Sequence, residues 1–399
     1  MRSVTDDERR ARLARRHAVA PVHRVADAVA ATRAMTVLHA TEPATVHLSV
    51  HARVDDFLRE DLDTALETER SLVRQLAMRR TMFVFPRDLL PATWASAAAR
   101  TGSAERARLA KDVERAGVAD DGLAWLAAAE RGVLEALNAA PEGLTMVELR
   151  AAVPLIDVRV TLPSSQVQPG RVLTVLGAEG TVVRGANTQH WRVFRPRWTT
   201  MSSWLGEAPA RPGAAEGYAE LVRRWLATFG PGTETDLVWW LGATKGAVRA
   251  ALAQVGAVQV RLDGGEAGYV LPGDPIVADP EPAGEPWAAL LPVLDPTVMG
   301  WKERGFYLSE HAARLFDRNG NAGTTAWWCG RVVGCWVQSD DGAVEVRLLD
   351  DVGAAARAAL SVEAARLERW LAGERVGTVY PSSAMRDAPG DLPYPAVRA

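Results

Sequence analysis

The chain has 399 residues, more than one ordinary domain, so we expect two to four domains with cores of ample size. Hydrophobic residues make up 48% and charged residues 24%, values typical of globular proteins that argue against disorder throughout the chain. Lys and Arg total 46 against 49 Asp and Glu, and the net charge of −3 excludes a global excess of positive charge that would indicate nucleic acid.

Arginine replaces lysine almost everywhere, since Lys111, Lys245 and Lys302 are the only lysines in the sequence. Two explanations remain open. Genomic GC bias would exchange Lys for Arg throughout the chain. A functional preference would favour Arg because its forked guanidinium suits phosphates and base edges better than an ammonium group does.

The two cysteines, Cys329 and Cys335, are too few for a disulfide framework or a four-cysteine zinc site. The first 16 residues are rich in Arg but lack the apolar stretch of a signal peptide. No run of 18 apolar residues occurs, so we expect no membrane-spanning helix. We therefore predict a cytoplasmic protein without a cofactor, which would be nucleoid-associated if its partner is DNA.

Residues 1–91 are predicted to form a winged helix, which consists of three helices followed by a two-stranded hairpin. The predicted elements are helices over 22–37 and 44–54, a short helix between Asp55 and Asp63, and strands over 71–76 and 81–85. The strands flank a tight corner at Met78-Arg79-Arg80. A helix over 92–116 then bridges to the next unit.

The same outline recurs twice, which is the strongest organisational signal in the sequence. The second unit, which with the bridging helix covers 92–200, is predicted to contain helices over 123–138 and 145–153 and strands over 173–175, 181–184 and 190–194. Thr145 and Glu148 have the spacing of a capping box. The third unit, 201–273, is predicted to contain helices over 218–229, 233–241 and 244–254 and a hairpin of strands over 257–262 and 268–271.

Residues 274–399 have a different pattern. The predicted elements are a Pro- and Gly-rich acidic linker over 275–286, an apolar stretch over 288–294, a short helix over 311–316, the hairpin signal Asn319-Gly320, strands over 324–328, 331–338 and 343–349, and a closing helix over 354–371. The chain is therefore predicted as α+β, with tandem winged helices and a small C-terminal β-barrel or sheet capped by a helix.

The third unit places Lys245 and Arg249 on the presumed recognition helix, whose N-terminal residues would meet base edges or phosphates. The alternatives are that Arg249 is only a solvated surface residue and that the winged helices bind protein. We favour double-stranded DNA as the partner, because three units would allow one duplex to be held at several points.

The hairpin corner with Arg79 and Arg80 is predicted to enter a groove or to hold phosphate. The alternative is that both arginines pair with Asp61 or Glu67 on the preceding helix, as solvated ion pairs worth under ~1 kcal/mol. The sequence leaves these two interpretations equally open.

None of the seven histidines belongs to a metal-binding motif. His47 and His51 would share a helix face, but no Glu follows the first in the His-Glu-x-x-His arrangement, so we expect no metal. His39 is predicted at a corner between two helices, where it would either cap the first helix or project into a cleft.

A set of short segments carries a family resemblance that extends from about Val25 to Trp370. The segments are His39–Thr45, Ala52–Val54, Arg80–Pro86, Trp204–Gly206, Leu291–Asp295, Gly300-Trp301, Asp317–Asn321 and Gly330–Gly334. Together they resemble the bacterial winged-helix DNA glycosylases of the AlkZ/YcaQ superfamily. The resemblance implies winged helices arranged as a C around duplex DNA, with a C-terminal β-barrel.

This resemblance also implies an activity. Enzymes of the superfamily are hydrolases that excise N7-alkylated purines and unhook interstrand crosslinks, and some provide self-resistance to genotoxic natural products. We accordingly expect a DNA-repair enzyme that acts as a monomer. In addition to the four basic residues already named, we expect Arg53, Arg318 and Asn319, which lie in the matching segments, to contact DNA.

The catalytic motif of the superfamily is Gln-x-Gln in one branch and Gln-x-Asp in the other, directly before Asp/Glu-Pro. In this chain His39 and Thr41 occupy the two motif positions, and Glu42-Pro43 follows as in the superfamily. An N7-alkylguanine is already cationic, so the enzyme must chiefly position a water against C1′ and stabilise an oxocarbenium-like centre.

Each motif residue has a chemically reasonable role. The imidazole of His39 could accept a hydrogen bond from the water and serve as a base. Thr41 could place the water but cannot take its proton, and Glu42 could face the oxocarbenium. Because His39 and Thr41 depart from the usual motif, the alternative is a DNA-binding protein, regulatory or lesion-sensing, that has lost the chemistry.

Overall fold

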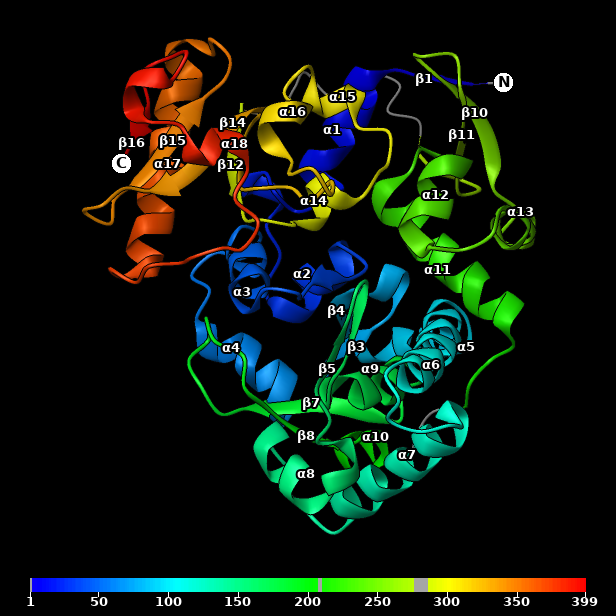
Figure 1. The fold of residues 1–399 in the computed structure, drawn as a ribbon. Coiled ribbons are helices and arrows are strands. Elements are labelled where there is room, and N and C mark those ends of the chain that lie inside the picture. The colour runs from blue at the N-terminus through cyan, green and yellow to red at the C-terminus, as the bar shows by residue number, and fades with distance from the viewer. Residues whose placement is uncertain (1, 207–209, 276–285) are drawn as a thin grey trace.

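The computed structural model describes residues 2–206, 210–275 and 286–399, and these form a mixed α and β structure (Figure 1). Most of the predicted linker over 275–286 lies outside the described residues. One large hydrophobic cluster includes buried side chains from Leu13 near the N-terminus to Ala384 near the C-terminus, and smaller clusters lie elsewhere in the structure. Segments that are distant in sequence are therefore packed together.

The first part of the chain differs from the predicted winged helix in several of its elements. In order it contains β1 (Ser3–Val4), α1 (Asp6–Arg16), α2 (Ala28–Ala34), β2 (Leu38–His39), α3 (Pro43–His51), α4 (Arg59–Asp63), β3 (Leu72–Leu76) and β4 (Met82–Pro86). The helix predicted over 22–37 is shorter, because a 3₁₀ turn at Pro21–His23 precedes it and Thr36 has a φ of 64°, outside the helical range. β2 is absent from the predicted elements, and it pairs with β4 in a three-stranded sheet of order β2-β4-β3.

The second part contains α5 (Leu90–Ala95), α6 (Ala97–Arg115), α7 (Gly122–Asn138), α8 (Met146–Ala152), β5 (Val160–Leu162), β6 (Ser165–Val167), α9 (Gly170–Ala178), β7 (Val182–Asn187), β8 (Pro196–Thr200) and α10 (Met201–Leu205). The predicted bridging helix is broken at Ser96, whose φ and ψ of −127° and −96° are not helical. The capping box of Thr145 and Glu148 is confirmed at the start of α8.

Two strands predicted in this second part are wrong. The segment 173–175 lies within α9, because a short apolar run does not distinguish a strand from the buried face of a helix. The segment 190–194 precedes the actual strand β8, which pairs with β7 in a two-stranded sheet.

The third part has the predicted order of elements. It contains α11 (Ala214–Phe229), α12 (Glu234–Leu241) and α13 (Lys245–Gln254), followed by the hairpin of β10 (Val258–Leu262) and β11 (Ala267–Val270). Gly242 ends α12 with a φ of 61°, which glycine adopts without strain, and the side chain of Thr244 caps α13. β9 (Gly232–Thr233) and the N-terminal β1 extend this hairpin into a four-stranded sheet.

The C-terminal part contains an open sheet instead of the predicted barrel. Its strands β12 (Ala288–Leu291), β13 (Thr325–Trp328), β14 (Arg331–Gln338), β15 (Val344–Leu348) and β16 (Val397–Arg398) are paired in that linear order, so β12 and β16 are its two edges. The predicted closing helix is present as α17 (Gly353–Leu371), which packs against the sheet. Four short helices complete this part, α14 (Pro296–Met299), α15 (Gly305–Leu308), α16 (Ala312–Leu315) and α18 (Ser383–Arg386). Asn319-Gly320 lies in a turn closed by a single bridge between Phe316 and Ala322.

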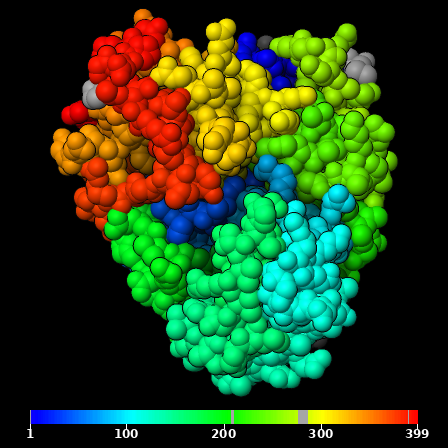
Figure 2. Space-filling model, in the orientation of Figure 1, coloured from blue at the N-terminus to red at the C-terminus, as the bar shows by residue number. Residues whose placement is uncertain are grey.

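The parts of the chain surround the elements that follow α1. In Figure 1 the C-terminal sheet and the helices α11–α13 lie on opposite sides of one broad end, and α7 and α8 form the narrow end. In the space-filling view the blue N-terminal elements are recessed between the yellow and red C-terminal part and the cyan and green part (Figure 2).

A fully buried ion pair between Arg53 and Asp295 joins the N-terminal and C-terminal parts. The guanidinium donates to Asp295 Oδ1 at 2.7 Å and Oδ2 at 2.9 Å, to the carbonyls of His17 and Ser49 at 3.0 and 2.7 Å, and to Thr297 Oγ1 at 2.8 Å. These five contacts use every N–H group of the arginine. The pair therefore fixes the ends of α1 and α3 to the start of α14.

The Asp295 carboxylate is equally well satisfied. It also accepts hydrogen bonds from the Ser49 hydroxyl at 2.8 Å and from the Thr297 backbone N–H at 2.9 Å. Burial alone would raise the pKa of Asp295, but the charge and hydrogen bonds of Arg53 outweigh it, and the pKa is held below its ordinary value.

We expect Asp295→Ala to reduce the free energy of unfolding by about 3–5 kcal/mol, because it leaves the buried charge of Arg53 without compensation. Urea denaturation measures this change. The exposed pair of Arg150 and Asp157, whose Nε–Oδ1 distance is 2.7 Å, supplies the control, since Asp157→Ala should leave the transition midpoint nearly unchanged. Equal effects of the two substitutions would contradict the structural importance of the buried pair.

Candidate active site

The segment with the predicted catalytic residues runs from β2 into the N-terminus of α3. His39 pairs with Phe83 in the sheet, and the Ala40 N–H donates to the Met82 carbonyl at 2.9 Å. The predicted corner between two helices is therefore a corner between a strand and a helix. After it, Thr41 is exposed and Glu42 is buried, and Pro43 begins α3, where its fixed φ suits the first helical position.

His39 is buried and electrically neutral at pH 7. Burial lowers the pKa of its imidazole to about 3, and the nearby charge of Arg79 contributes to this shift. The ring lies edge-on to Phe83 with centroids 5.2 Å apart, and its Nδ1 has no hydrogen-bond partner among the described residues. Since a group with so low a pKa is a poor proton acceptor, His39 is suited to orienting a water rather than deprotonating it.

A cavity beside His39 and Arg79 has a volume of about 10 Å³, which is room for one water molecule and too little for a nucleobase. A nucleobase would therefore have to bind at another part of the motif segment.

Glu42 is buried under a C-terminal segment that we call the strap, residues 372–381, which follows α17. Its Oε1 accepts hydrogen bonds from the Thr378 hydroxyl at 2.8 Å and the Val379 N–H at 2.6 Å. Burial raises the pKa of Glu42, and these two hydrogen bonds oppose the rise only in part. No cation among the described residues lies within ion-pair distance of Glu42, so its charge is uncompensated inside the protein.

Arg79 and Arg304 form a second group of uncompensated charges close to His39. Both guanidinium groups lie over the ring of Trp239, at 4.0 and 5.1 Å from its centroid. Burial lowers the pKa of Arg79 to about 10, with a further contribution from the charge of Arg304, although part of the side chain is exposed. Among the described residues neither arginine has a carboxylate within 4.0 Å, unlike most arginines of this structure.

The motif segment, residues 39–43, therefore contains a buried carboxylate without a cationic partner, that of Glu42. Near its other end lie the guanidinium groups of Arg79 and Arg304, which have no carboxylate partner among the described residues. Residues 32–370 match the family model of DNA glycosylase AlkZ-like proteins.

The chain belongs to the AlkZ-like DNA glycosylase family.

A solved structure, the Streptomyces sahachiroi DNA glycosylase AlkZ, is similar with a TM-score of 0.73 at 20% sequence identity, over 94% of this chain and 99% of that chain. At this identity the likeness shows a shared fold. No curated protein sequence matches the chain. The family resemblance seen in the sequence is thus confirmed for an AlkZ-like chain whose motif reads His39-Ala40-Thr41.

The residues predicted to contact DNA fall into two groups in this AlkZ-like structure. Arg53 is buried with all its donors used internally, so it serves packing here, not phosphate binding. Arg80 pairs with Glu105 at 2.9 Å and Arg249 with Glu234 at 2.7 Å. Arg79, Lys245 and Arg318 have no ion pair with a described carboxylate, and Asn319 is a neutral, exposed residue of a turn. Neither Arg79 nor Arg80 pairs with Asp61 or Glu67, the partners considered in the sequence analysis.

His47 and His51 both lie buried on α3, where they take part in packing. His47 Nε2 is 3.3 Å from Asp63 Oδ1, and the His51 ring stacks on Trp370 with centroids 4.7 Å apart. No group of three potential metal ligands comes together in the residues that the structure describes. Over the same residues, no helix has both the length and the apolar character needed to cross a membrane.

No motif in the sequence indicates Arg304, Trp239 or the strap as part of the site. The excess of tryptophan in the sequence, 14 residues, was a signal for aromatic surfaces, but it does not say which rings lie beside arginines. The strap follows the last residue of the family match, so no motif of the family could have indicated it.

We expect Glu42→Gln to raise the melting temperature at pH 7 by about 1–3 °C. A raised carboxyl pKa means that the folded protein binds the proton more tightly than the unfolded chain, so the ionised form costs stability above that pKa. The amide oxygen keeps both hydrogen bonds to the strap, whereas the charge is removed. Differential scanning calorimetry measures the change.

The difference between wild type and Glu42→Gln should shrink as the pH falls below the raised pKa and disappear below the ordinary glutamate pKa, where the wild-type side chain is neutral in both the folded and the unfolded chain. Glu310→Gln is the control, because Glu310 is exposed. A lower melting temperature of Glu42→Gln at pH 7 would contradict the uncompensated burial of this charge.

Proposed function

We propose that this AlkZ-like chain is a monofunctional DNA glycosylase that hydrolyses the N-glycosidic bond of N7-alkylated purines in duplex DNA, with crosslinked purines as the bulkier members of the same class. The observation that carries the proposal is the uncompensated carboxylate of Glu42 within the motif segment. An N7-alkylpurine and the oxocarbenium formed from its sugar are both cationic, so a buried anion stabilises the transition state electrostatically.

The three motif residues divide the work. Glu42 stabilises positive charge on the base and the sugar. The Thr41 hydroxyl, which is exposed and has no hydrogen-bond partner among the described residues, places the attacking water. His39 remains neutral and orients a water molecule. The cationic base leaves without a strong general acid, so a proton donor is not required.

DNA binding is assigned to the third part of the chain, as a winged helix, and to the arginines beside the motif. Arg79 and Arg304 are available to neutralise phosphates next to the lesion, because no carboxylate of the described residues pairs with them. Lys245 at the N-terminus of α13 and the exposed Arg318 and Asn319 are proposed as further contacts. The domain boundaries and a C-shaped arrangement around DNA belong to the same proposal.

A glycosylase assay tests the activity. Duplexes carrying N7-methylguanine or an N7 interstrand crosslink are incubated with excess protein, and abasic sites are counted after alkaline cleavage. Wild type should produce abasic sites, Glu42→Gln should be slower by about 100-fold, and Thr41→Val by about tenfold, the equivalent of one hydrogen bond. Glu310→Gln should retain the wild-type rate.

No abasic sites above background with any lesion would refute the proposed activity. If duplex binding persists in that case, the chain is a lesion-binding protein without glycosylase chemistry. The observation that favours this second function is that His39 and Thr41 differ from the usual residues of the catalytic motif.

The salt dependence of binding tests the arginine pair. Each phosphate contact that is lost should reduce the slope of log K against log salt by about 0.9, so Arg79→Gln and Arg304→Gln should each lower the slope by this amount. Fluorescence anisotropy on an undamaged duplex measures it. Arg249→Gln is the matched control, because Glu234 already neutralises Arg249, and its slope should change less. Unchanged slopes in both test variants would remove these arginines from the DNA surface.

A further inference from the structure

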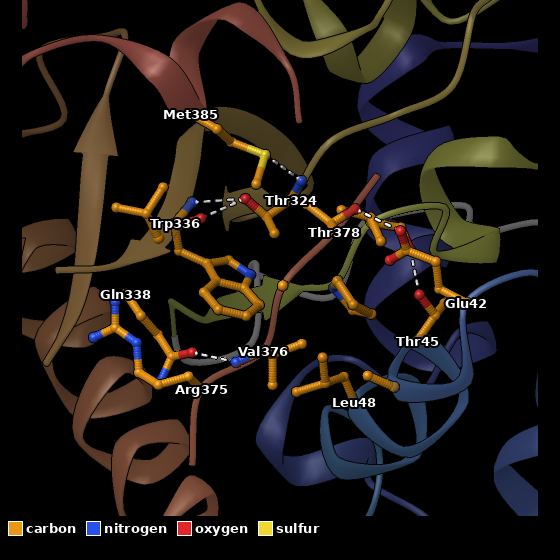
Figure 3. Close-up of a pocket in the computed structure, with 15 residues that line it drawn as sticks. Glu42, Thr45, Leu48, Thr324, Trp336, Gln338, Arg375, Val376, Thr378 and Met385 are labelled. Carbon is orange, nitrogen blue, oxygen red and sulfur yellow. Dashed lines mark hydrogen bonds between the residues drawn. The ribbon is translucent and has the colours of Figure 1, made fainter. Parts of the chain in front are cut away.

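A cavity of about 170 Å³ lies between α3, the C-terminal sheet and the strap (Figure 3). Glu42 and Leu48 line it from the first part of the chain, Val293 from the C-terminal part, and Val376 from the strap. The strap lies between the end of α17 and the start of α18 and contains no helix or strand. Since it has no ladder of backbone hydrogen bonds, contacts with side chains must fix its course.

Glu374 anchors the beginning of the strap. Its Oε1 accepts a hydrogen bond from Arg59 Nη1 at 2.8 Å. Its Oε2 accepts one from the Trp191 indole N–H at 2.8 Å, and Arg192 Nε and His190 Nε2 lie 3.0 and 3.2 Å from the same oxygen. These partners belong to α4 and to the loop between β7 and β8. The strap is therefore fixed against two segments that are far from it in the sequence.

Gln338 of β14 provides the next contact with the strap. Its Nε2 donates to the Glu374 carbonyl at 2.9 Å, and its Oε1 accepts a hydrogen bond from the Val376 N–H at 2.8 Å. One side chain thus bonds both a donor and an acceptor of the strap backbone. The last of these contacts lies only two residues before Thr378, so the position of Thr378 is well defined.

Thr378 and Val379 hold the carboxylate of Glu42 at the far end of the strap. The Thr378 hydroxyl donates to Glu42 Oε1 at 2.8 Å, and its oxygen accepts a hydrogen bond from the Tyr380 N–H at 2.9 Å. The Val379 N–H donates to the same Oε1 at 2.6 Å. Because the Tyr380 N–H occupies a lone pair of the Thr378 oxygen, the hydroxyl proton is left to point at Glu42.

Glu42 is also the N-cap residue of α3, yet its carboxylate makes no capping hydrogen bond to that helix. A polar side chain at an N-cap commonly accepts a hydrogen bond from the N–H groups of the first helical turn. In this chain the carboxylate bonds to the strap instead. The orientation of the carboxylate is therefore set by residues near the end of the chain and not by the helix that begins beside it.

We propose that the strap is a positioning element of the site and that Thr378 is a positioning residue, whose hydroxyl fixes the Glu42 carboxylate in the orientation that stabilises positive charge. The inference rests on the proposed function, in which Glu42 acts on the cationic base and sugar. Thr378 acts only through Glu42. A preorganised charge needs no rearrangement at the moment of reaction, so a carboxylate that loses one of its two hydrogen bonds is less effective.

The hydrogen bonds from the strap also keep Glu42 ionised. Burial raises the pKa of Glu42, and the bonds from Val379 and Thr378 lower it. Burial and the charge of Glu42 both raise the pKa of the Tyr380 phenol. Arg375 is the other titratable residue among those that line the cavity, and its guanidinium donates to backbone carbonyls between β14 and β15. Loss of the Thr378 hydroxyl should therefore raise the pKa of Glu42 further.

A direct measurement of the Glu42 pKa tests the inference without catalysis. Carbon-13 NMR follows the titration of the carboxyl groups in glutamate-labelled protein, and Glu42→Gln identifies the resonance. Thr378→Val, which replaces the hydroxyl by a methyl group of similar size, should raise the pKa of Glu42 by about 0.5–1. Thr378→Ser retains the hydroxyl and should keep the wild-type value. Thr174→Val is the matched control, since it removes a hydroxyl hydrogen bond of 2.9 Å within α9.

Single-turnover excision of N7-methylguanine gives the second readout. Thr378→Val should lower the rate at pH 7 by about three- to tenfold, because the carboxylate is held less firmly and is less often ionised. The acid limb of its pH profile should move to higher pH, and its affinity for the duplex should be unchanged. Thr378→Ser should restore the rate and the profile, and Thr174→Val should match wild type in both.

The inference is overturned if Thr378→Val changes neither the pKa of Glu42 nor the acid limb, or if Thr378→Ser is as impaired as Thr378→Val. Thermal unfolding verifies that each variant is folded, and Thr378→Ala, with the same expected direction, replaces Thr378→Val if that variant does not fold.

These results are distinct from failure of the proposed function. A chain that excises N7-methylguanine with the same rate and profile in wild type and Thr378→Val keeps its function and loses this inference. A chain that excises nothing loses the glycosylase function, and the pKa of Glu42 then still decides whether Thr378 controls the carboxylate.

Discussion

The position of the motif depends on the buried pair of Arg53 and Asp295. Arg53 follows α3 and Asp295 begins α14, so the pair locks the helix that starts at Glu42 onto the segment that contributes Val293 to the cavity wall. The Thr45 hydroxyl, which donates to the Val293 carbonyl at 3.2 Å, reinforces the same contact. With every donor and acceptor of the pair satisfied, the arrangement is rigid, and a rigid frame is what electrostatic catalysis requires.

The site itself has the opposite character. Glu42 is buried without a cation, and Arg79 and Arg304 surround Trp239 without a carboxylate, although other arginines of the structure have partners. Buried charges without a partner lower the stability of the folded protein. Stability is commonly sacrificed in this way where a site must act on charge.

Local patterns in the sequence predicted most helices of the third part, the strands β13–β15 and the capping box of α8, because spacing and turn residues act over a few positions. These patterns gave wrong or missing elements where contacts with distant segments determine the local structure. The apolar run within α9 reads equally well as a strand, and β2 exists only because β4 lies beside it. The motif segment was recognisable from His39 to Pro43, but the partners of Arg53 come from segments up to 244 residues away.

The strap determines when, during synthesis of the chain, the cavity beside the motif can form. It closes over Glu42 from beyond residue 370, where the family match ends, and joins a wall made of the last part of the chain to a motif made of the first. While the chain is still on the ribosome, the N-terminal motif is complete in sequence but lacks this wall. The cavity beside it therefore forms only after the strap has been synthesised and has packed against α3.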